Sequence, residues 1–213
     1  MKKTKDPALM WAIENSLRTS PEQLFCGVDE AGRGCLCGPV VAGAVILPEG
    51  IALEGVTDSK KLTPAQRDRA FDLIAEKAVA WAVGFASPRE IDEINILNAT
   101  FLAMERAVRQ LSPVPDIILV DGNRSPKIDI NTVCVVKGDS KSLNIAAASI
   151  MAKVSRDRYM CRLAEEYPQY DLQSHKGYPT KEHYTLIGKH GVAPFYRKTF
   201  LRNLDEHLQQ LQS

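Results

Sequence analysis

Carboxylates occur at three places in this sequence where an apolar run gives way to glycine. Asp29 and Glu30 end one such run, just before Gly32. Asp121 stands before a glycine after a second run, and Asp139 follows a glycine after a third. In α/β proteins, ligands collect at the sheet edge that strand ends form. We therefore expect these four acids to meet at one edge of a sheet.

Four carboxylates held this close together would oppose folding, because like charges at short range raise one another's pKa. A divalent cation removes that conflict. The donors are hard oxygens with no histidine or thiolate near them in the sequence, which favours Mg²⁺ or Mn²⁺ over zinc. Two such ions roughly 4 Å apart can hold the attacking water and the leaving oxygen of an in-line phosphoryl displacement. The acids thus indicate phosphodiester hydrolysis.

Each acid also has an ordinary structural explanation. Asp-Gly is a common turn pair, and an aspartate at a strand end often caps the following helix. Glycosidases need paired acids as well, but their carboxyl groups stand roughly 5 Å or more apart, and aromatic platforms typically hold the sugar. Aromatic residues make up only 7% of this chain, which makes glycoside hydrolysis the weaker alternative.

The adjacent acids Asp29 and Glu30 raise a geometric difficulty, because neighbouring residues of a regular strand point to opposite faces of the sheet. Our hypothesis is that the strand ends or bulges at Glu30, so that both side chains face the same ions. Glycine permits such a departure, and three glycines lie nearby: Gly27, Gly32 and Gly34.

The tripeptide Gly32-Arg33-Gly34 gives the backbone room to approach a ligand closely, and Arg33 adds a cation suited to phosphate. A Gly-Arg-Gly tripeptide by itself is more often a tight turn than a binding loop. Its position directly after the acidic pair makes this one a candidate for binding.

The strands that must carry these acids are predicted from β-branched apolar runs bounded by glycine, proline or aspartate. We expect four strands, at residues 24–29, 39–47, 116–120 and 132–136.

Helices are predicted from caps and apolar spacing. Two capping boxes, Thr63-Pro64-Ala65-Gln66 and Ser87-Pro88-Arg89-Glu90, mark helix starts. The first helix should reach about residue 77, and the second about residue 111 with a break near residues 95–98. An early helix beginning at Asp6-Pro7 would place three residues on one face, Leu9, Ile13 and Leu17. Further helices are expected at 143–167, at 180–189 and after 200, with the part from about 168 laid over one end of the sheet.

The bulk properties fit one globular α/β domain of 213 residues, 45% of them hydrophobic and 25% charged. The longest apolar stretch, Pro39–Pro48, is too short to span a bilayer, and no apolar signal region follows residues 1–6. We therefore expect a cytoplasmic protein without a membrane partner. A net charge of +1 means that nucleic acid must bind through a local basic patch. The five cysteines lack zinc-site or redox-motif spacing and are expected to be reduced thiols packed as small hydrophobes.

Together these residues resemble the signature segments of type 2 ribonucleases H, and specifically of the bacterial ribonuclease HII family. The resemblance begins with Gly27–Gly34 followed by Gly38-Pro39 and covers roughly residues 24 to 200. The joint match is far more specific than any single motif. The further blocks that resemble this family, in order, are Asp58-Ser59-Lys60-Lys61-Leu62, Asp121-Gly122-Asn123, Lys137-Gly138-Asp139-Ser140, Ala147–Val154 and His175-Lys176-Gly177-Tyr178.

The resemblance implies a ribonuclease H-like α/β fold, a mixed sheet flanked by helices with a helical C-terminal extension. It implies an endonuclease that hydrolyses the RNA strand of RNA/DNA hybrids. Such an enzyme also cuts on the 5′ side of single ribonucleotides embedded in duplex DNA, as in ribonucleotide excision repair, and leaves a 3′-hydroxyl and a 5′-phosphate. We expect a monomer, and we see no clear sliding-clamp binding motif after Phe200.

The domain organisation follows from the extent of the match. Residues 1–20 form an N-terminal extension without a match in the family, and residues 21–213 are expected to form a single catalytic domain. This domain includes the helical C-terminal part at about 168–213.

The resemblance also implies roles for individual positions. It makes the four acids the ligands of a two-metal site for Mg²⁺ or Mn²⁺, with Asp29 and Asp121 shared between the ions. The remaining two acids then complete one site each. The four metal-binding and catalytic positions are Asp29, Glu30, Asp121 and Asp139.

Substrate contacts are implied at eight positions. Gly32, Arg33 and Gly34 match the loop that senses the 2′-hydroxyl, the group by which proteins tell RNA from DNA. Tyr178 matches a tyrosine that packs on a sugar beside the scissile phosphate; without the family context it would be an aromatic residue packing in a turn. Positions that match contacts to the substrate backbone are Ser59, Lys60, Ser149 and Lys153.

The chain departs from the family pattern at Cys35 and Cys37 inside the loop and at Asn144, where a small residue is common. Two alternatives stay open. One is a silent binder of hybrid duplexes, which would gain nothing from four negative charges at a phosphate. The other is the related ribonuclease HIII, which typically carries an extra N-terminal domain and a different acidic quartet.

Overall fold

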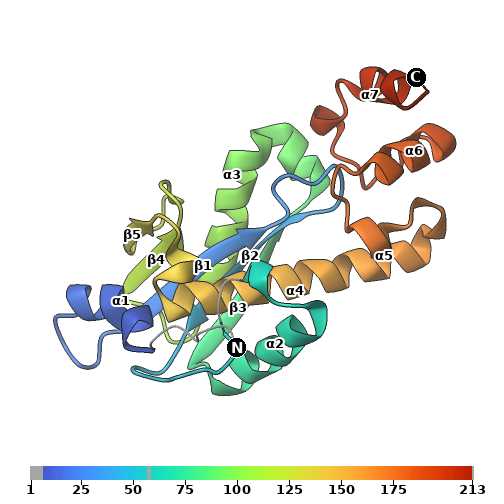
Figure 1. Ribbon diagram of the computed structural model, residues 1–213. Coiled ribbons are helices and arrows are strands. Elements are labelled where there is room, and N and C mark those ends of the chain that lie inside the picture. Colours follow the sequence, from blue (N-terminus) through green and yellow to red (C-terminus); the bar gives the residue numbers. More distant parts are fainter. Residues whose placement is uncertain (1–6, 57–58, 213) are drawn as a thin grey trace.

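The computed structural model describes residues 7–56 and 59–212, so Asp58 of one matched block lies outside the described residues. Its centre is a five-stranded mixed sheet in the order β3-β2-β1-β4-β5 (Figure 1). The first three strands in chain order pair antiparallel, whereas β1, β4 and β5 run parallel. The strands are β1 (Phe25–Ala31), β2 (Val40–Ile46), β3 (Ala80–Ala86), β4 (Ile117–Asp121) and β5 (Asn131–Val135).

Helices cover both faces of this sheet. Helix α3 packs on one face, and α4 packs on the other with α2 against it. None of the helices within the described ranges is long and apolar enough to cross a membrane. The α-helices are α1 (Ala12–Leu17), α2 (Pro64–Lys77), α3 (Pro88–Val108), α4 (Leu143–Glu166), α5 (Leu172–His175), α6 (Lys181–His190) and α7 (Leu204–Gln212). The 3-10 helices are η1 (Pro7–Trp11), η2 (Ser59–Lys61), η3 (Gly138–Ser140), η4 (Pro168–Tyr170) and η5 (Lys198–Phe200).

Side chains of the central strand β1 alternate between these two helical layers. Cys26 and Val28 belong to the core beneath α3, and Phe25 belongs to a core that includes Ile145 of α4. Gly27, between Cys26 and Val28 in the sequence, faces α4. A Cβ atom at this position would lie 2.1 Å from the backbone carbonyl carbon of Asn144. Glycine is needed at this position because the first turns of α4 lie directly on the strand that carries the acidic pair.

The C-terminal part has a core of its own beyond the end of β1 (Figure 1). It packs on the second half of α4 and on the loop of residues 32–39, rather than over the face of the sheet. Its buried residues include Leu36 from the loop, Met160 from α4, and Tyr170, Ile187 and Phe195 from the C-terminal part. This part is therefore built around the loop that follows the acidic pair.

The predicted elements agree with the structure wherever a local pattern specifies them. Both capping boxes form, with Thr63 and Ser87 as the N-caps of α2 and α3. The predicted break in α3 is confirmed at Asn95, whose φ of 66° and ψ of 165° interrupt the helix. Strand β3 is absent from the predicted strands because its alternation, in Ala80–Ala86, contains alanine and glycine, which are depleted in strands.

The expected apolar face of the first helix is only partly correct. Ile13 and Leu17 pack against the core beneath α4, as predicted. Leu9 is 64% exposed, because residues 7–11 form a 3-10 helix with a different side-chain spacing from an α-helix. In its place the polar residue Glu14 is fully buried.

All five cysteines are free thiols, as expected. Cys26, Cys35 and Cys37 are buried and pack as small hydrophobes, whereas Cys161 is half-buried and Cys134 is exposed. The expectation of buried packing is therefore wrong for Cys134.

Candidate active site

Strand β1 runs regularly through the acidic pair. It pairs with β2 from Cys26↔Ile46 to Ala31↔Val41 without an extra residue on either strand. Asp29 lies on the α4 side, where the Ser149 hydroxyl donates a hydrogen bond to it, whereas Glu30 lines a cavity on the α3 side. The hypothesis that the strand ends or bulges at Glu30 is therefore wrong.

The two carboxylates lie on opposite faces of β1, on either side of an open strand edge. The parallel ladder between β1 and β4 ends at Val28↔Val120, and Asp121 is the last residue of β4. Beyond Val28, the strand edge on the β4 side is no longer covered by paired backbone. Side chains from both faces of β1 can approach Asp121 there, and the charge of Asp121 acts on both Asp29 and Glu30.

Burial and mutual repulsion govern the electrostatics of this edge. Burial raises the pKa of Asp29 well above its ordinary value, and the charges of Glu30 and Asp121 raise it further. Hydrogen bonds from the Ser149 hydroxyl and from the Glu30 N–H, the latter 2.7 Å long, offset only part of this effect. Burial also raises the pKa of Glu30, although Arg33 at 3.3 Å opposes the rise. The edge concentrates negative charge that a cation would stabilise.

The fourth acid stands beside this group. The backbone N–H of Gly138 donates a 2.6 Å hydrogen bond to Asp121 Oδ1, and Asp139 is the next residue, half-buried in η3. A Cβ atom at Gly138 would lie 2.5 Å from Ile145 of α4, so glycine allows η3 to approach the first turn of α4. The structure thus brings Asp29, Glu30 and Asp121 together, with Asp139 adjacent.

The donor chemistry of these side chains fits a hard divalent cation, because every donor is a carboxylate oxygen. Within residues 7–56 and 59–212, however, no three His, Cys, Asp or Glu side chains already enclose a common point at which an ion could be held. Coordination of one ion by three or more of these acids would therefore require the carboxylates to move inward.

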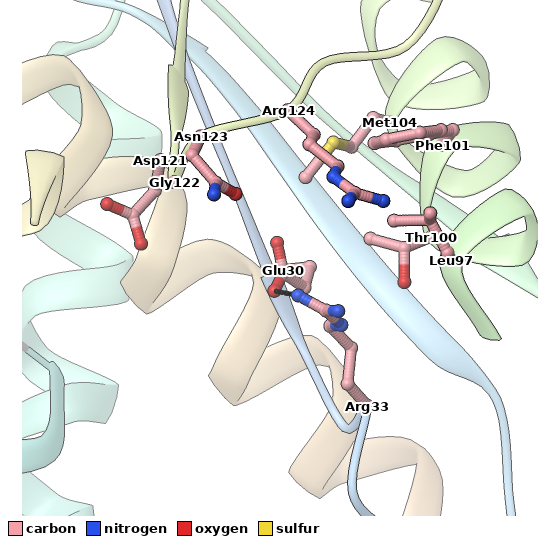
Figure 2. A pocket seen from close by; sticks show the side chains of 10 residues that line it. All are labelled: Glu30, Arg33, Leu97, Thr100, Phe101, Met104, Asp121, Gly122, Asn123 and Arg124. Atoms are coloured by element: carbon pink, nitrogen blue, oxygen red, sulfur yellow. Dashed lines mark hydrogen bonds and ion pairs between the residues drawn. The ribbon is translucent and has the colours of Figure 1, made fainter. Parts of the chain in front are cut away.

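A cavity of about 310 Å³ opens on the α3 side of the edge (Figure 2). Glu30 and Arg33 form an ion pair on one side of it, and Arg124 points toward the wall that α3 provides. Arg124 is absent from the predicted site residues, although it directly follows the block Asp121-Gly122-Asn123. The cavity is lined by Glu30, Arg33, Leu97, Thr100, Phe101, Met104, Asp121, Gly122, Asn123 and Arg124.

The other predicted contact residues lie on the α4 side of Asp29. The hydroxyl groups of Ser59 and Ser149 are 2.9 Å apart, and both residues are buried. One helical turn further along α4, the ammonium of Lys153 pairs with Asp157 at 2.8 Å and lies 5.4 Å from the centre of the Tyr178 ring. The side chain of Tyr178 is 39% exposed to solvent. Lys60 lies near enough to the acids for its charge to lower the pKa of Glu30. The two buried serines and the more accessible Lys153 and Tyr178 thus lie along the same side of α4.

Two fully buried arginines hold the loop of residues 32–39, and neither is among the predicted site residues. Arg156 donates to the carbonyl oxygens of Pro39 and Cys37 at 3.1 and 3.2 Å, and to that of Lys176 at 2.9 Å. Arg197 donates to the carbonyl oxygens of Gly38, Arg33 and Gly32 at 3.0, 2.9 and 2.8 Å. The loop carbonyls are thereby turned toward the protein interior. We name this pair, Arg156 and Arg197, the arginine clamp.

The arginine clamp explains the glycine at position 32. A Cβ atom there would lie 2.0 Å from Nε of Arg156, and the φ of Gly32 is +93°, a value that side chains disfavour. A sequence signal existed for Arg156, because it falls on the buried stripe of α4 that also contains Ser149 and Met160. A charged residue on an apolar stripe indicates a buried polar contact. We find no comparable signal for Arg197.

Two stacked histidines, His175 and His183, bind the backbone of Tyr178. The rings of His175 and His183 lie 3.9 Å apart at 21°. Nδ1 of His183 lies 2.9 Å from the carbonyl oxygen of Tyr178, which can only accept, so this nitrogen carries the proton; Nε2 then accepts from the Tyr196 hydroxyl at 3.0 Å. The backbone N–H of Tyr178 donates to the backbone carbonyl oxygen of His175 at 2.9 Å, and the N–H of Gly177 donates to Nδ1 of the His175 ring at 3.1 Å. Burial lowers the pKa of both histidines, that of His183 to about 4, so both rings are neutral at pH 7.

Comparisons with known proteins show which family the chain is similar to. The family model described as Ribonuclease HII matches residues 26–203. A Ribonuclease HII of Bacteroides thetaiotaomicron is 58% identical over 175 residues, 82% of this chain and 88% of that protein. One of Clostridioides difficile is 53% identical over 178 residues, 84% of this chain and 70% of that protein.

Solved structures show the same fold. The crystal structure of a ribonuclease H2 from Pyrococcus horikoshii superposes with a TM-score of 0.71 at 28% identity, covering 90% of this chain and 100% of that one. A ribonuclease HII from Archaeoglobus fulgidus, solved in a complex with PCNA, gives 0.65 at 28% identity over 82% of this chain and 93% of that one. Bst-RNase HIII in complex with Mn²⁺, at 19% identity and a TM-score of 0.65 over 100% of this chain and 77% of that one, supports the fold alone.

Proposed function

The chain belongs to the ribonuclease HII family, and from that premise we propose that it incises duplex DNA on the 5′ side of single embedded ribonucleotides. As a member of this family it is a ribonuclease H, an endonuclease that hydrolyses RNA paired with DNA. The proposed cleavage uses a divalent-metal site with two ions and leaves a 3′-hydroxyl and a 5′-phosphate. Its substrates are RNA/DNA hybrids and ribonucleotide-containing duplexes, and the enzyme acts as a monomer.

The observation that carries this proposal is the convergence of Asp29, Glu30 and Asp121 at the open edge of β1. We assign Asp29 and Asp121 as shared ligands, and Glu30 and Asp139 as ligands of one ion each. Bound Mg²⁺ or Mn²⁺ would activate water and stabilise the charge that develops on the leaving 3′-oxygen. The carboxylates orient these groups, and burial of Asp29 strengthens its interaction with a cation.

Substrate recognition is proposed for the loop beside the acids. The arginine clamp turns the carbonyls of residues 32–39 inward, which leaves the Gly32-Arg33-Gly34 segment able to approach the 2′-hydroxyl of a ribonucleotide. Tyr178 presents its exposed ring to the neighbouring sugar. Contacts to the phosphate backbone are assigned to Ser59, Lys60, Ser149 and Lys153, which share the α4 side of the edge.

The binding-only alternative and the ribonuclease HIII alternative both make a different prediction for one substrate. A DNA duplex with a single embedded ribonucleotide is incubated with Mg²⁺, with Mn²⁺ or with chelator, and the products are resolved on a gel. We expect one incision on the 5′ side of the ribonucleotide with metal and none with chelator. Binding without incision would support the silent module, and cleavage restricted to longer RNA stretches would contradict the proposed substrate.

A further inference from the structure

Residues 12–17 of the N-terminal segment contribute one carboxylate to the interior of the molecule. Helix α1 packs Ile13 and Leu17 against the core beneath α4. Between them in the sequence, Glu14 is fully buried. Its Oε1 accepts hydrogen bonds from the Ser142 hydroxyl at 2.5 Å and from the Asn144 amide at 3.0 Å. A residue of the first helix thus contacts the start of α4, which lies beside the candidate active site.

Ser142 connects this carboxylate to the acidic edge. It is the N-cap of α4, where its hydroxyl accepts from the Ile145 N–H at 3.2 Å. The backbone N–H of Ser142 donates to the carbonyl oxygen of Gly138 at 2.9 Å, and the N–H of Gly138 donates to Asp121 at 2.6 Å. Asp139 lies within the turn that these bonds close. Four consecutive hydrogen-bonded groups therefore run from Glu14 to the ends of β4 and η3.

Asn144 ties the same carboxylate to the sheet. Its amide nitrogen donates to Glu14, and its amide oxygen accepts from the backbone N–H of Leu47, just past the end of β2, at 2.9 Å. Both ends of this buried side chain are therefore engaged. The start of α4 is held from two directions, by the N-terminal segment and by the sheet, at the place where Asn144 lies directly against Gly27 of β1.

Burial of the Glu14 carboxylate is energetically unfavourable, and α1 does not need it in order to pack on the core. A buried carboxylate is unfavourable unless it is well compensated, and Oε2 of Glu14 accepts no hydrogen bond from the part of the chain that the structure describes. The compensation comes from the two donors and from the positive end of the dipole of α4. Apolar residues such as Ile13 and Leu17 already attach α1 to the core. The carboxylate must therefore be explained by the groups that it holds.

We propose that Glu14 is a positioning residue for the metal-binding acids: through Ser142 it fixes the Gly138–Ser140 turn, and so the placement of Asp121 and Asp139. This inference rests on the proposed function of those two acids. It gives the N-terminal segment a part in the active-site scaffold.

The test compares Glu14→Ala, Glu14→Gln and Ser142→Ala with the parent enzyme. Mn²⁺ binding to the free protein is measured by electron paramagnetic resonance, and exchange of the Gly138 and Ser142 amide protons is followed by NMR. We expect Glu14→Ala and Ser142→Ala to weaken Mn²⁺ binding by about 10-fold, the scale of outer ligand supports, and to accelerate exchange at both amides. Glu14→Gln keeps the accepting oxygen and should restore most of the affinity.

Trp11→Phe serves as the matched control, because it removes the hydrogen bond from the Trp11 indole to the Ile51 carbonyl oxygen on another side of the same segment. It should lower thermal stability without changing Mn²⁺ binding. The double variant Glu14→Ala/Ser142→Ala should be no weaker in Mn²⁺ binding than either single variant, because both remove one link. If Glu14→Ala does not fold, Ser142→Ala carries the test.

The outcomes separate this inference from the proposed function. Unchanged Mn²⁺ binding and amide exchange in both Glu14→Ala and Ser142→Ala, with parent-like metal-dependent cleavage, would overturn the role of Glu14 alone. A parent enzyme that binds no Mn²⁺, or whose binding survives Asp121→Asn, would instead overturn the metal-site assignment on which it rests.

Discussion

The acidic edge of the sheet and the loop beside it hold their charges in opposite ways. At the edge, Asp29 and Glu30 face Asp121, and burial together with this repulsion raises the pKa of both. In the loop, the arginine clamp places two guanidinium groups against backbone carbonyl oxygens, each with three hydrogen bonds. Burial lowers the pKa of Arg197 only to about 10, so it stays charged at pH 7.

This difference indicates how the two regions divide their tasks. The loop satisfies its polar groups internally and so is rigid before any substrate arrives. The acidic edge concentrates charge of one sign, which a cation would stabilise. If the proposed function is correct, the loop can select a substrate without depending on the metal. The predictions below test that division, in order of decreasing effect.

The largest effect is expected at the acidic edge. Asp29→Asn should reduce cleavage by at least about 10³-fold, as for removal of one member of a catalytic unit. Because the substitution removes a repelling charge, the metal-free protein should be as stable as the parent or more so. Single-turnover cleavage and urea denaturation measure the two quantities. A metal-free Asp29→Asn protein that is several kcal/mol less stable would mean that the carboxylate serves the fold.

The arginine clamp should behave in the reverse manner. Arg197→Lys keeps the charge but loses the planar fork that serves three carbonyl oxygens. We expect the free energy of unfolding to fall by about 3 kcal/mol, because buried carbonyls lose their donors. Urea denaturation measures this loss, with Arg202→Lys on the exposed surface as the control. Equal free energies of unfolding in the two variants would show that the arginine clamp does not stabilise the fold.

The histidine pair beneath Tyr178 predicts a dependence on pH. The folded pKa of His183 is about 4, below the ordinary value of 6.5, so the unfolded chain binds more protons between these values. The free energy of unfolding should therefore fall as pH decreases from 6.5 to 4, by about 2 kcal/mol for this group. His183→Gln should flatten the curve. An identical slope in the parent and His183→Gln would contradict the neutral buried ring.

The smallest effect concerns the metal. Mn²⁺ at ten times its dissociation constant should raise the free energy of unfolding of the parent by about 1.4 kcal/mol, because it binds the folded state. Asp121→Asn should lose this increase, whereas Arg197→Lys should keep it if the two regions are independent. Thermal denaturation with and without Mn²⁺ provides the comparison. Loss of the increase in Arg197→Lys would show that the loop and the metal site are coupled.

The sequence predicts what short segments determine by themselves. Capping boxes at Thr63 and Ser87, strand ends at acids, and the break at Asn95 all follow from neighbouring residues. The expected bulge at Glu30 is wrong because convergence of the acids depends on where β4 stops pairing, and a strand's own residues do not encode its neighbour's length.

Contacts between distant segments could not be predicted in this way. Arg197 binds carbonyl oxygens of Gly32 and Arg33, more than 160 positions earlier, and backbone carbonyls leave no trace in residue types. The contacts of Glu14 could not be predicted either, because its partners Ser142 and Asn144 are known only once the position of α1 beside the start of α4 is known. The four acids could be predicted from the sequence because their side chains themselves supply the groups that would bind a cation.

Anomalous diffraction from crystals soaked in Mn²⁺ locates the bound ion without reference to activity. We predict anomalous density between Asp29 and Asp121, with Glu30 and Asp139 turned inward to complete the coordination. Density elsewhere on the molecule, with these four carboxylates left as they are, would contradict a metal centre at the open edge of β1.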